Sequence, residues 1–445
     1  MTCAPTRRTA RWGCLALLFL AIARAVRAAD DAPITREEFL RLQQQNQQMQ
    51  QQLEKQQQLI DSLTRKVSEI QQAPPTPTQA PAPANNEAEA LPVEKSFHFG
   101  SVAISGEGGL AFFDSQTGGQ TPNAEFRVDE ARLFLDAPVW DEVYFYTELD
   151  LATHEQNDLA LRYGELYLDF ENLSRLWGRD GMLTLRAGRF YIPFGEEYQD
   201  RFAIDNPLIS HSVSDLWGAD NGVQLFGTVD KVSYNLAVQS GGGSASRDFT
   251  GDKSVAGRIG YDPAKWLHLS VSGMRTGELD VQNDVVSALW FGGGFFRSLG
   301  SPATTRFQAN LVEGDVQTRF SFLQLRGAGG YINYGDNDPN GSNHRDVYYY
   351  YVEGKYDLTR KLYAAARMSE VFAHNGFPIV GNGPMGAYLF GNLTTQYWRL
   401  SLGAGYAFSK NLVMKAEYSL NRGVELDGTP RDQEDAFALE AAFAF

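Results

Sequence analysis

The C-terminal residues 435–445, Asp-Ala-Phe-Ala-Leu-Glu-Ala-Ala-Phe-Ala-Phe, alternate large apolar side chains with small or charged ones. This alternation puts Phe437, Leu439, Phe443 and Phe445 on one face of a β-strand, because successive side chains of a strand point to opposite faces. Similar segments separated by turns recur through about 350 residues, which is the pattern of a transmembrane β-barrel. The repetition therefore predicts a barrel whose outer face is apolar and whose inner face is polar.

We predict an all-β fold for residues 97–445, a 16-stranded antiparallel transmembrane β-barrel. The predicted strands cover residues 99–113, 125–137, 142–153, 159–170, 181–190, 220–229, 231–240, 254–262, 266–276, 305–314, 317–333, 346–357, 361–370, 396–408, 412–422 and 434–445. Short and long connections alternate, and in such barrels the short turns face the periplasm and the long loops face outside. A barrel of this size is expected to hold a water-filled lumen.

Composition agrees with many twisted strands joined by tight turns, since 12% of the residues are aromatic and 43 are glycine. Mean hydropathy is −0.33, and beyond the first residues no apolar run is long enough for a membrane-spanning helix. Residues 97–445 contain 28 Lys and Arg against 44 Asp and Glu. This acidic excess argues against nucleic acid as a partner.

The first 28 residues have the pattern of a signal peptide. Arg7, Arg8 and Arg11 precede the apolar run 13–23, and small residues follow it. Cleavage is expected after Ala25 or Ala28. The two cysteines of the chain both lie in this segment, so the exported protein is expected to have neither thiols nor disulfides.

Residues 29–72 predict an N-terminal α-helical coiled coil. Thr35 and Glu38 form a capping-box pattern at its start. The heptad positions a and d are occupied by Phe39, Leu42, Asn46, Met49, Leu53, Gln56, Ile60, Leu63, Val67 and Ile70. One amphipathic helix cannot bury its own stripe, so the segment implies self-association, as a dimer or a trimer. The Pro-rich residues 73–96 are predicted to be a linker.

The barrel segment resembles the phosphate-selective porins of the O and P type. The resemblance rests on 126–135, 143–152, 183–196, 255–263 and 414–419. It implies a homotrimeric porin of the bacterial outer membrane, with membrane lipid and small hydrophilic solutes or anions as partners. It also implies inward-folded loops and lumen cations that guide anions, although this chain departs from the family in its few barrel lysines and its acidic excess.

Charged residues between apolar neighbours on a strand should face the lumen, because a charge facing lipid is costly. The cationic candidates are Arg132, Arg186, Arg258, Arg326, Arg367 and Lys415, and the acidic ones are Glu148, Asp150, Glu165, Glu353 and Glu417. Two interpretations stay open. The cations form a wall that selects anions, or they pair with carboxylates of neighbouring strands, as Arg132 would with Glu148 and Lys415 with Glu440.

The long loop 191–219 has two alternative positions. It folds into the pore as a constriction, or it covers the mouth of the barrel. In the first case Arg189 and Arg201 are expected near the narrowest point.

These observations predict a passive channel for small hydrophilic solutes, with a preference for anions or phosphate implied by the resemblance. The alternative is a structural anchor that tethers the envelope through the periplasmic coiled coil. We expect neither enzyme activity nor a cofactor. We also expect no metal site, because the six histidines are dispersed and show no metal-ligand spacing.

Overall fold

The computed structural model describes most of the chain from residue 97 onward. The described residues are 97–99, 101–152, 162–216, 218–242, 247–281, 283, 304–339, 343–377 and 393–445. The predicted signal peptide (1–28), coiled coil (29–72) and linker (73–96) lie outside them.

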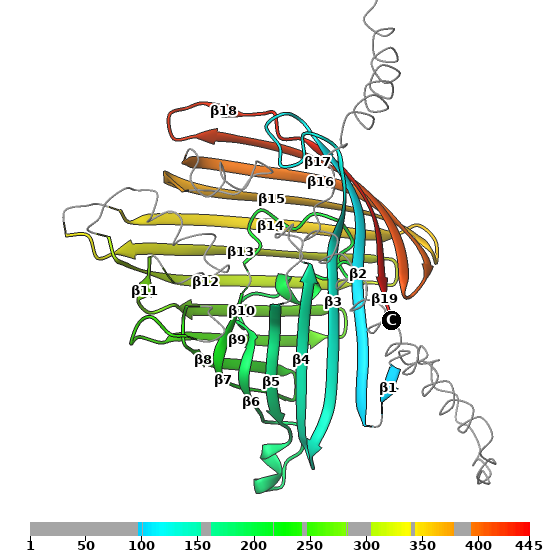
Figure 1. The fold of residues 1–445 in the computed structure, drawn as a ribbon, viewed down its shortest axis with the longest axis vertical. Helices are drawn as coiled ribbons and strands as arrows, with labels where there is room; N and C mark the ends of the chain where they lie inside the picture. Colours follow the sequence, from blue (N-terminus) through cyan, green and yellow to red (C-terminus); the bar gives the residue numbers. More distant parts are fainter. Residues whose placement is uncertain are drawn as a thin grey trace, which may run out of the picture. The chain divides into compact units, whose positions relative to one another are not determined.

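Sixteen strands of 8 to 16 residues form one antiparallel sheet that closes on itself (Figure 1). They are β2 (Val102–Ser115), β3 (Glu125–Trp140), β4 (Val143–Ala152), β5 (Arg162–Phe170), β6 (Thr184–Tyr191), β7 (Ala219–Val229), β8 (Val232–Gln239), β9 (Ser254–Ala264), β10 (Leu267–Arg275), β12 (Arg306–Arg319), β13 (Leu323–Asp336), β14 (Arg345–Asp357), β15 (Leu362–Phe377), β16 (Thr394–Ser409), β17 (Leu412–Glu425) and β19 (Ala436–Ala444). The last strand pairs with β2, with Ala436 opposite Ser115. The predicted 16-stranded antiparallel barrel is confirmed.

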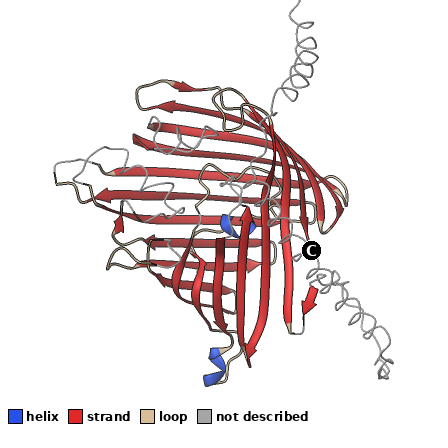
Figure 2. Cartoon of the chain, viewed as in Figure 1, coloured by secondary structure: helices blue, strands red, loops and turns tan. Residues whose placement is uncertain are grey.

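Three short strands were not predicted: β1 (Phe97–Phe99), β11 (Leu279–Asp280) and β18 (Pro430–Arg431). Each adds a few hydrogen bonds to a long neighbour, β2, β12 and β17 respectively. Two short 3-10 helices, η1 (Leu173–Trp177) and η2 (Glu197–Asp200), are drawn in blue in Figure 2. No helix in the described part of the chain is long and apolar enough to cross a membrane.

The predicted boundary between the strands at 305–314 and 317–333 is wrong. The turn lies at 320–322, because β12 continues to Arg319. Residues 315–316 were left between the two predicted strands, yet Asp315 pairs with Ser270 on one side and Ala328 on the other. The Asp315 carboxylate points into the barrel, where the Ser270 hydroxyl donates to it at 3.2 Å.

Side chains of the wall alternate between an exposed outer face and a buried inner face. In β10, Val271 is 61% exposed whereas Ser272 is 1% exposed. In β4, Leu151 is exposed and Glu148 is completely buried, as the alternation predicted. The apolar outer face suits lipid, and the polar inner face defines the lumen.

The two ends of the barrel differ. Connections such as Asp230–Lys231 and Lys410–Asn411 join strands at one end, which we call the short-turn end. We call the other the long-loop end. There the inner faces of β12 to β15 carry apolar side chains, including Phe307, Ile332 and Val371, which pack in one buried cluster. The expected water-filled lumen is therefore replaced by a packed core in this sector.

The outer face gives a test of the wall's orientation. Val271 is the fifth of the nine residues of β10. The variant Val271→Arg should lose about 2–4 kcal/mol of folding free energy, because its charge would face lipid near the midplane. Urea titration of the protein folded in lipid vesicles measures this loss.

Val229→Arg is the matched control for this test. Val229 is also exposed but ends β7 beside the Asp230–Lys231 turn. Its arginine would reach the membrane surface, where the cost falls to about 0–1 kcal/mol. Equal losses in the two variants would contradict the assigned orientation of the wall.

Candidate functional site

Residues 192–218, between β6 and β7, fold into the barrel, and we call this segment the inner loop (Figure 1). Trp217 lies outside the described residues. The inner loop makes hydrogen bonds to inner-face side chains of β3, β9, β10, β12, β15, β16 and β17. Of the two predicted positions for the long loop, the structure has the one inside the pore.

Carboxylates of the wall accept hydrogen bonds from the backbone N–H groups of the inner loop. Glu130 on β3 accepts from Ala203 at 2.9 Å, and Asp315 on β12 accepts from Glu196 at 3.3 Å. Glu417 on β17 accepts from Ser210 at 2.8 Å and also from Ile209. Hydroxyls do the same, since Ser272 accepts from Gly195 and Ser369 from Val213. These bonds satisfy donors that the loop's irregular backbone leaves unpaired.

Cations of the wall donate to the carbonyl oxygens of the same loop. Lys415 donates to Leu208 at 3.2 Å and to Ala203, and Arg258 donates to Gly195. Arg367 donates to the Ser210 carbonyl at 2.6 Å, and Arg399 donates to the His211 carbonyl at 3.0 Å. The wall thus supplies acceptors and donors in turn along the loop backbone.

The inner loop also holds itself together. The Arg201 guanidinium pairs with the Asp215 carboxylate at 2.8 Å and hydrogen-bonds to the His211 ring at 3.1 Å. The Ser212 hydroxyl donates to Glu197 at 2.7 Å. These contacts join the outgoing and returning halves of the loop. Arg201 therefore stabilises the loop and is itself only 5% exposed.

Apolar side chains hold the ends of the inner loop at the long-loop end of the barrel. Ile192 and Phe194 enter the buried cluster from the start of the loop, and Val213 and Leu216 enter it from the return. All four are less than 10% exposed. Burial of this apolar surface complements the polar contacts made deeper in the lumen.

Arg132 sits in an acidic sector of the lumen. Its guanidinium lies 3.3 to 3.8 Å from carboxylate oxygens of Glu107, Glu130, Glu148 and Asp150. Four carboxylates therefore surround one cation, and the sector is not a cationic wall.

Other predicted cations are paired as well. Arg186 makes two 2.8 Å hydrogen bonds to Asp169 and lies 3.6 Å above the Tyr167 ring. Arg258 pairs with Glu196 at 3.2 Å. Arg326 contacts Asp200 and Glu353, Arg367 shares Glu353, and Lys415 pairs with Glu440 at 2.9 Å. This is the arrangement that the paired-charge interpretation described, including its Arg132–Glu148 and Lys415–Glu440 pairs.

Arg189 does not lie in the lumen. It is opposite Leu166 of β5, which is 39% exposed on the outer face, and its Nε donates to the Tyr163 carbonyl at 3.3 Å. The expectation that it lies near the narrowest point is wrong because Arg189 is a residue of β6 on the face opposite to that of Arg186. Counting by two from Arg186 along this strand puts Arg189 on the outer face.

The five predicted lumen carboxylates do lie inside the barrel. Glu148, Glu165, Glu353 and Glu417 are all less than 10% exposed, and the Asp150 side chain is 13% exposed. Glu165 accepts from the Tyr191 N–H at 2.8 Å, at the point where β6 leads into the inner loop.

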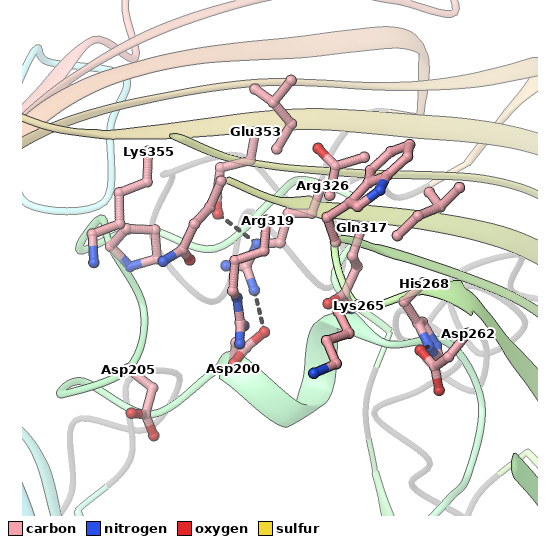
Figure 3. Close-up of a pocket in the computed structure, with 16 residues that line it drawn as sticks. Asp200, Asp205, Asp262, Lys265, His268, Gln317, Arg319, Arg326, Glu353 and Lys355 are labelled. Atoms are coloured by element: carbon pink, nitrogen blue, oxygen red, sulfur yellow. Dashed lines mark hydrogen bonds and ion pairs between the residues drawn. The ribbon is translucent and has the colours of Figure 1, made fainter. Parts of the chain in front are cut away.

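A cavity of about 330 Å³ lies between the inner loop and the wall at the short-turn end (Figure 3). Asp200, Asp205 and Pro207 of the loop line one part of it. The wall supplies residues from β9 to β14, among them Lys265 and Arg319. Its size lies within the range of small-molecule sites, which is roughly 300–1,000 Å³.

Asp205 faces this cavity from the inner loop. Its side chain is accessible to water but lies inside the barrel, where protein atoms surround it in part. This partial burial, together with Asp200, raises the pKa of the Asp205 carboxyl, and the nearby Lys415 ammonium opposes the rise.

Several residues of the site were not singled out from the sequence. Arg399 lies between Trp398 and Leu400, so strand alternation was a usable signal for its inward direction. Ser369 gave no signal, because a small hydroxyl suits either face of a strand. Lys265 and Arg319 lie at strand ends, where alternation does not determine direction.

Comparison with protein families gives one match, to the model described as "Putative beta-barrel porin-2, OmpL-like", over residues 155–445. The match covers more than half of the chain. The chain belongs to this porin family. The protein is located in the bacterial outer membrane. No curated protein matches the sequence.

Solved structures with the same fold are outer-membrane proteins. The channel DcaP of Acinetobacter baumannii has a TM-score of 0.55 and 13% identity, over 77% of this chain and 97% of that chain. OmpT of Vibrio cholerae has a TM-score of 0.53 and 12% identity, over 79% and 100%. OmpF of Salmonella typhi has a TM-score of 0.50 and 12% identity, over 77% and 97%. At these identities the similarity concerns the fold.

The carboxylate of Glu417 offers a test of how the inner loop is held. Glu417→Ala would leave the Ile209 and Ser210 N–H groups without their acceptor, at about 1–3 kcal/mol for each buried donor. We expect a loosened loop, seen as larger and noisier single-channel conductance in planar bilayers.

Glu278→Ala is the matched control, since Glu278 pairs with Arg306 on the exposed surface. It should leave the current traces unchanged. Identical traces for the two variants would show that Glu417 does not hold the loop.

Proposed function

We propose that this protein is a passive outer-membrane channel for small hydrophilic solutes, with the inner loop as its constriction. The observation that carries the proposal is a closed barrel whose lumen holds a folded loop and, beneath it, a polar cavity. Membership of a porin family supports it.

The finer possibility is a preference for anions or phosphate, as in the phosphate-selective porins that the sequence resembles. Seven of the eight cationic candidates face the lumen or belong to the inner loop, and each of these seven contacts a carboxylate. A cation that is already paired attracts a passing anion weakly, because the two partner charges largely cancel at a distance. We therefore propose weak ion selectivity without a saturable phosphate site.

Conductance in planar bilayers tests both the proposed channel and its weak ion selectivity. Across a tenfold KCl gradient we expect steady ohmic current and a reversal potential well below the ~59 mV of ideal selectivity. Added phosphate should leave the KCl current unblocked.

Two results would contradict the proposal in different ways. A large anion-selective potential with block by phosphate would favour the phosphate-selective alternative. Absence of any current from correctly folded protein would exclude the channel itself.

We also propose that the barrel assembles as a homotrimer. One structure of Vibrio cholerae OmpT, with a TM-score of 0.51 and 12% identity to this chain, is of a trimer form. Light scattering of the detergent-purified protein should give a protein mass three times that of the monomer. A monomer mass under mild detergent would contradict this assembly.

The envelope-anchor alternative depends on the coiled coil at 29–72, which lies outside the described residues. No contact among the described residues favours it over the channel. Deleting residues 30–96 separates the two roles, because a channel keeps its conductance without them.

A further inference from the structure

The cavity between the inner loop and the wall has equal numbers of positive and negative side chains. Four of its lining residues are cationic and four are anionic. The cations are Lys265, Arg319, Arg326 and Lys355, and the anions are Asp200, Asp205, Asp262 and Glu353. Figure 3 shows these side chains gathered around one space. Leaving out His268, which contacts Asp262 and Glu196, these eight groups have no net formal charge and favour neither anions nor cations by their total charge.

Part of this charge is already engaged within the protein. Arg326 contacts both Asp200 and Glu353, and Asp262 pairs with His268 at 2.8 Å. The Lys355 ammonium lies 3.9 Å from Asp357 and 4.6 Å from the centre of the Tyr363 ring. These groups are held by their partners and help to shape the cavity.

Two cations of the wall are not engaged. Lys265 belongs to the turn between β9 and β10, and Arg319 ends β12. Neither side chain forms a hydrogen bond or ion pair within the ranges of the chain that the structure describes, and both are exposed to water. The Arg319 N–H donates to the carbonyl of Trp266, the residue after Lys265, at 2.9 Å, and this bond keeps the end of β12 beside the turn that carries Lys265. The wall thus presents a pair of adjacent positive charges to the cavity.

One carboxylate of the inner loop is also not engaged. The Asp205 side chain forms neither a hydrogen bond nor an ion pair with any residue of the described ranges. In Figure 3 it lies apart from Lys265 and Arg319, on the loop side of the cavity. Unpaired charges of opposite sign therefore line one cavity, the positive ones from the wall and the negative one from the inner loop.

We propose that this cavity binds small zwitterions, of which free amino acids are the simplest class, as they pass the constriction. The inference rests on the proposed channel function and names its preferred solute. The solute carboxylate would contact Lys265 and Arg319, and its ammonium group would contact Asp205. Binding of both ends satisfies all three unpaired groups without adding net charge to the balanced cavity.

Other solute classes fit less well. Inorganic phosphate would meet the two wall cations but also the unpaired Asp205 carboxylate, which repels it. A polyamine would meet Asp205 but also Lys265 and Arg319. An uncharged polyol would leave all three groups with water as their partner. A zwitterion is the class whose two charges match both sides of the cavity.

Swelling of proteoliposomes compares these classes directly, because it does not require the solute to carry current. Four-carbon solutes keep size constant: γ-aminobutyrate as zwitterion, erythritol as uncharged solute, succinate as dianion and putrescine as dication. The unaltered protein should admit γ-aminobutyrate about two- to fivefold faster than erythritol, the effect expected of solvent-exposed charge contacts. The ratio of the two rates cancels differences in the amount of inserted protein.

Variants assign the preference to the cavity. In Asp205→Asn and in the double variant Lys265→Gln/Arg319→Gln, the ratio should fall to about one, because each removes one side of the charge match. Asp205→Asn should also favour succinate over putrescine, and the double variant should do the opposite. Lys253→Gln and Asp248→Asn are matched controls, since these residues pair on the exposed surface between β8 and β9. Both should keep the ratio of the unaltered protein.

Each outcome has a distinct meaning. Failure to swell in erythritol would overturn the proposed channel. Swelling in erythritol without faster entry of γ-aminobutyrate would overturn only the zwitterion inference. A preference that survives both cavity variants, or is lost equally in the controls, would also overturn it. Loss of the preference in the cavity variants alone would establish the site.

Discussion

The structure depends on hydrogen-bond partners for the backbone N–H and C=O groups of the inner loop. This loop has almost no regular structure and is enclosed by the barrel. Buried N–H and C=O groups without partners cost about 1–3 kcal/mol each, so the inner loop can stay in the lumen only if the wall supplies partners. Glu417, Asp315 and Glu130 supply acceptors, and Lys415 and Arg367 supply donors. The charged lumen is therefore first a means of holding the constriction.

This role limits what the same charges contribute to transport. Arg367 is 2% exposed and Lys415 is 3% exposed, and both are bound to the loop and to carboxylates of the wall. Such groups set the shape of the passage more than they attract solutes. Charges that remain open to solutes lie at the short-turn end, in the cavity with Lys265, Arg319 and Asp205. The unpaired charges of the cavity thus lie beside paired ones such as Arg326 and Glu353, which help to shape it.

Strand periodicity predicted the wall well. All sixteen long strands appear, and Glu148, Glu353 and Glu417 face inward because a charge between apolar neighbours has only one tolerable side. Two predictions failed for different reasons. The strand β12 was divided at 315–316, although it continues to Arg319. Arg189 was expected near the narrowest point although it lies in β6 three residues from the inward-facing Arg186, where alternation puts it on the outer face.

The amino-acid sequence by itself determined the barrel, the number of its strands and the inner face of its charged residues, because these follow from local alternation and from the cost of charge in lipid. Only the tertiary structure decided what the charges do. Ser210 is more than 200 positions from Glu417 along the chain, as is Ala203 from Lys415, and the path of the inner loop brings them together. No local pattern records that path, since it depends on many backbone groups finding partners at once.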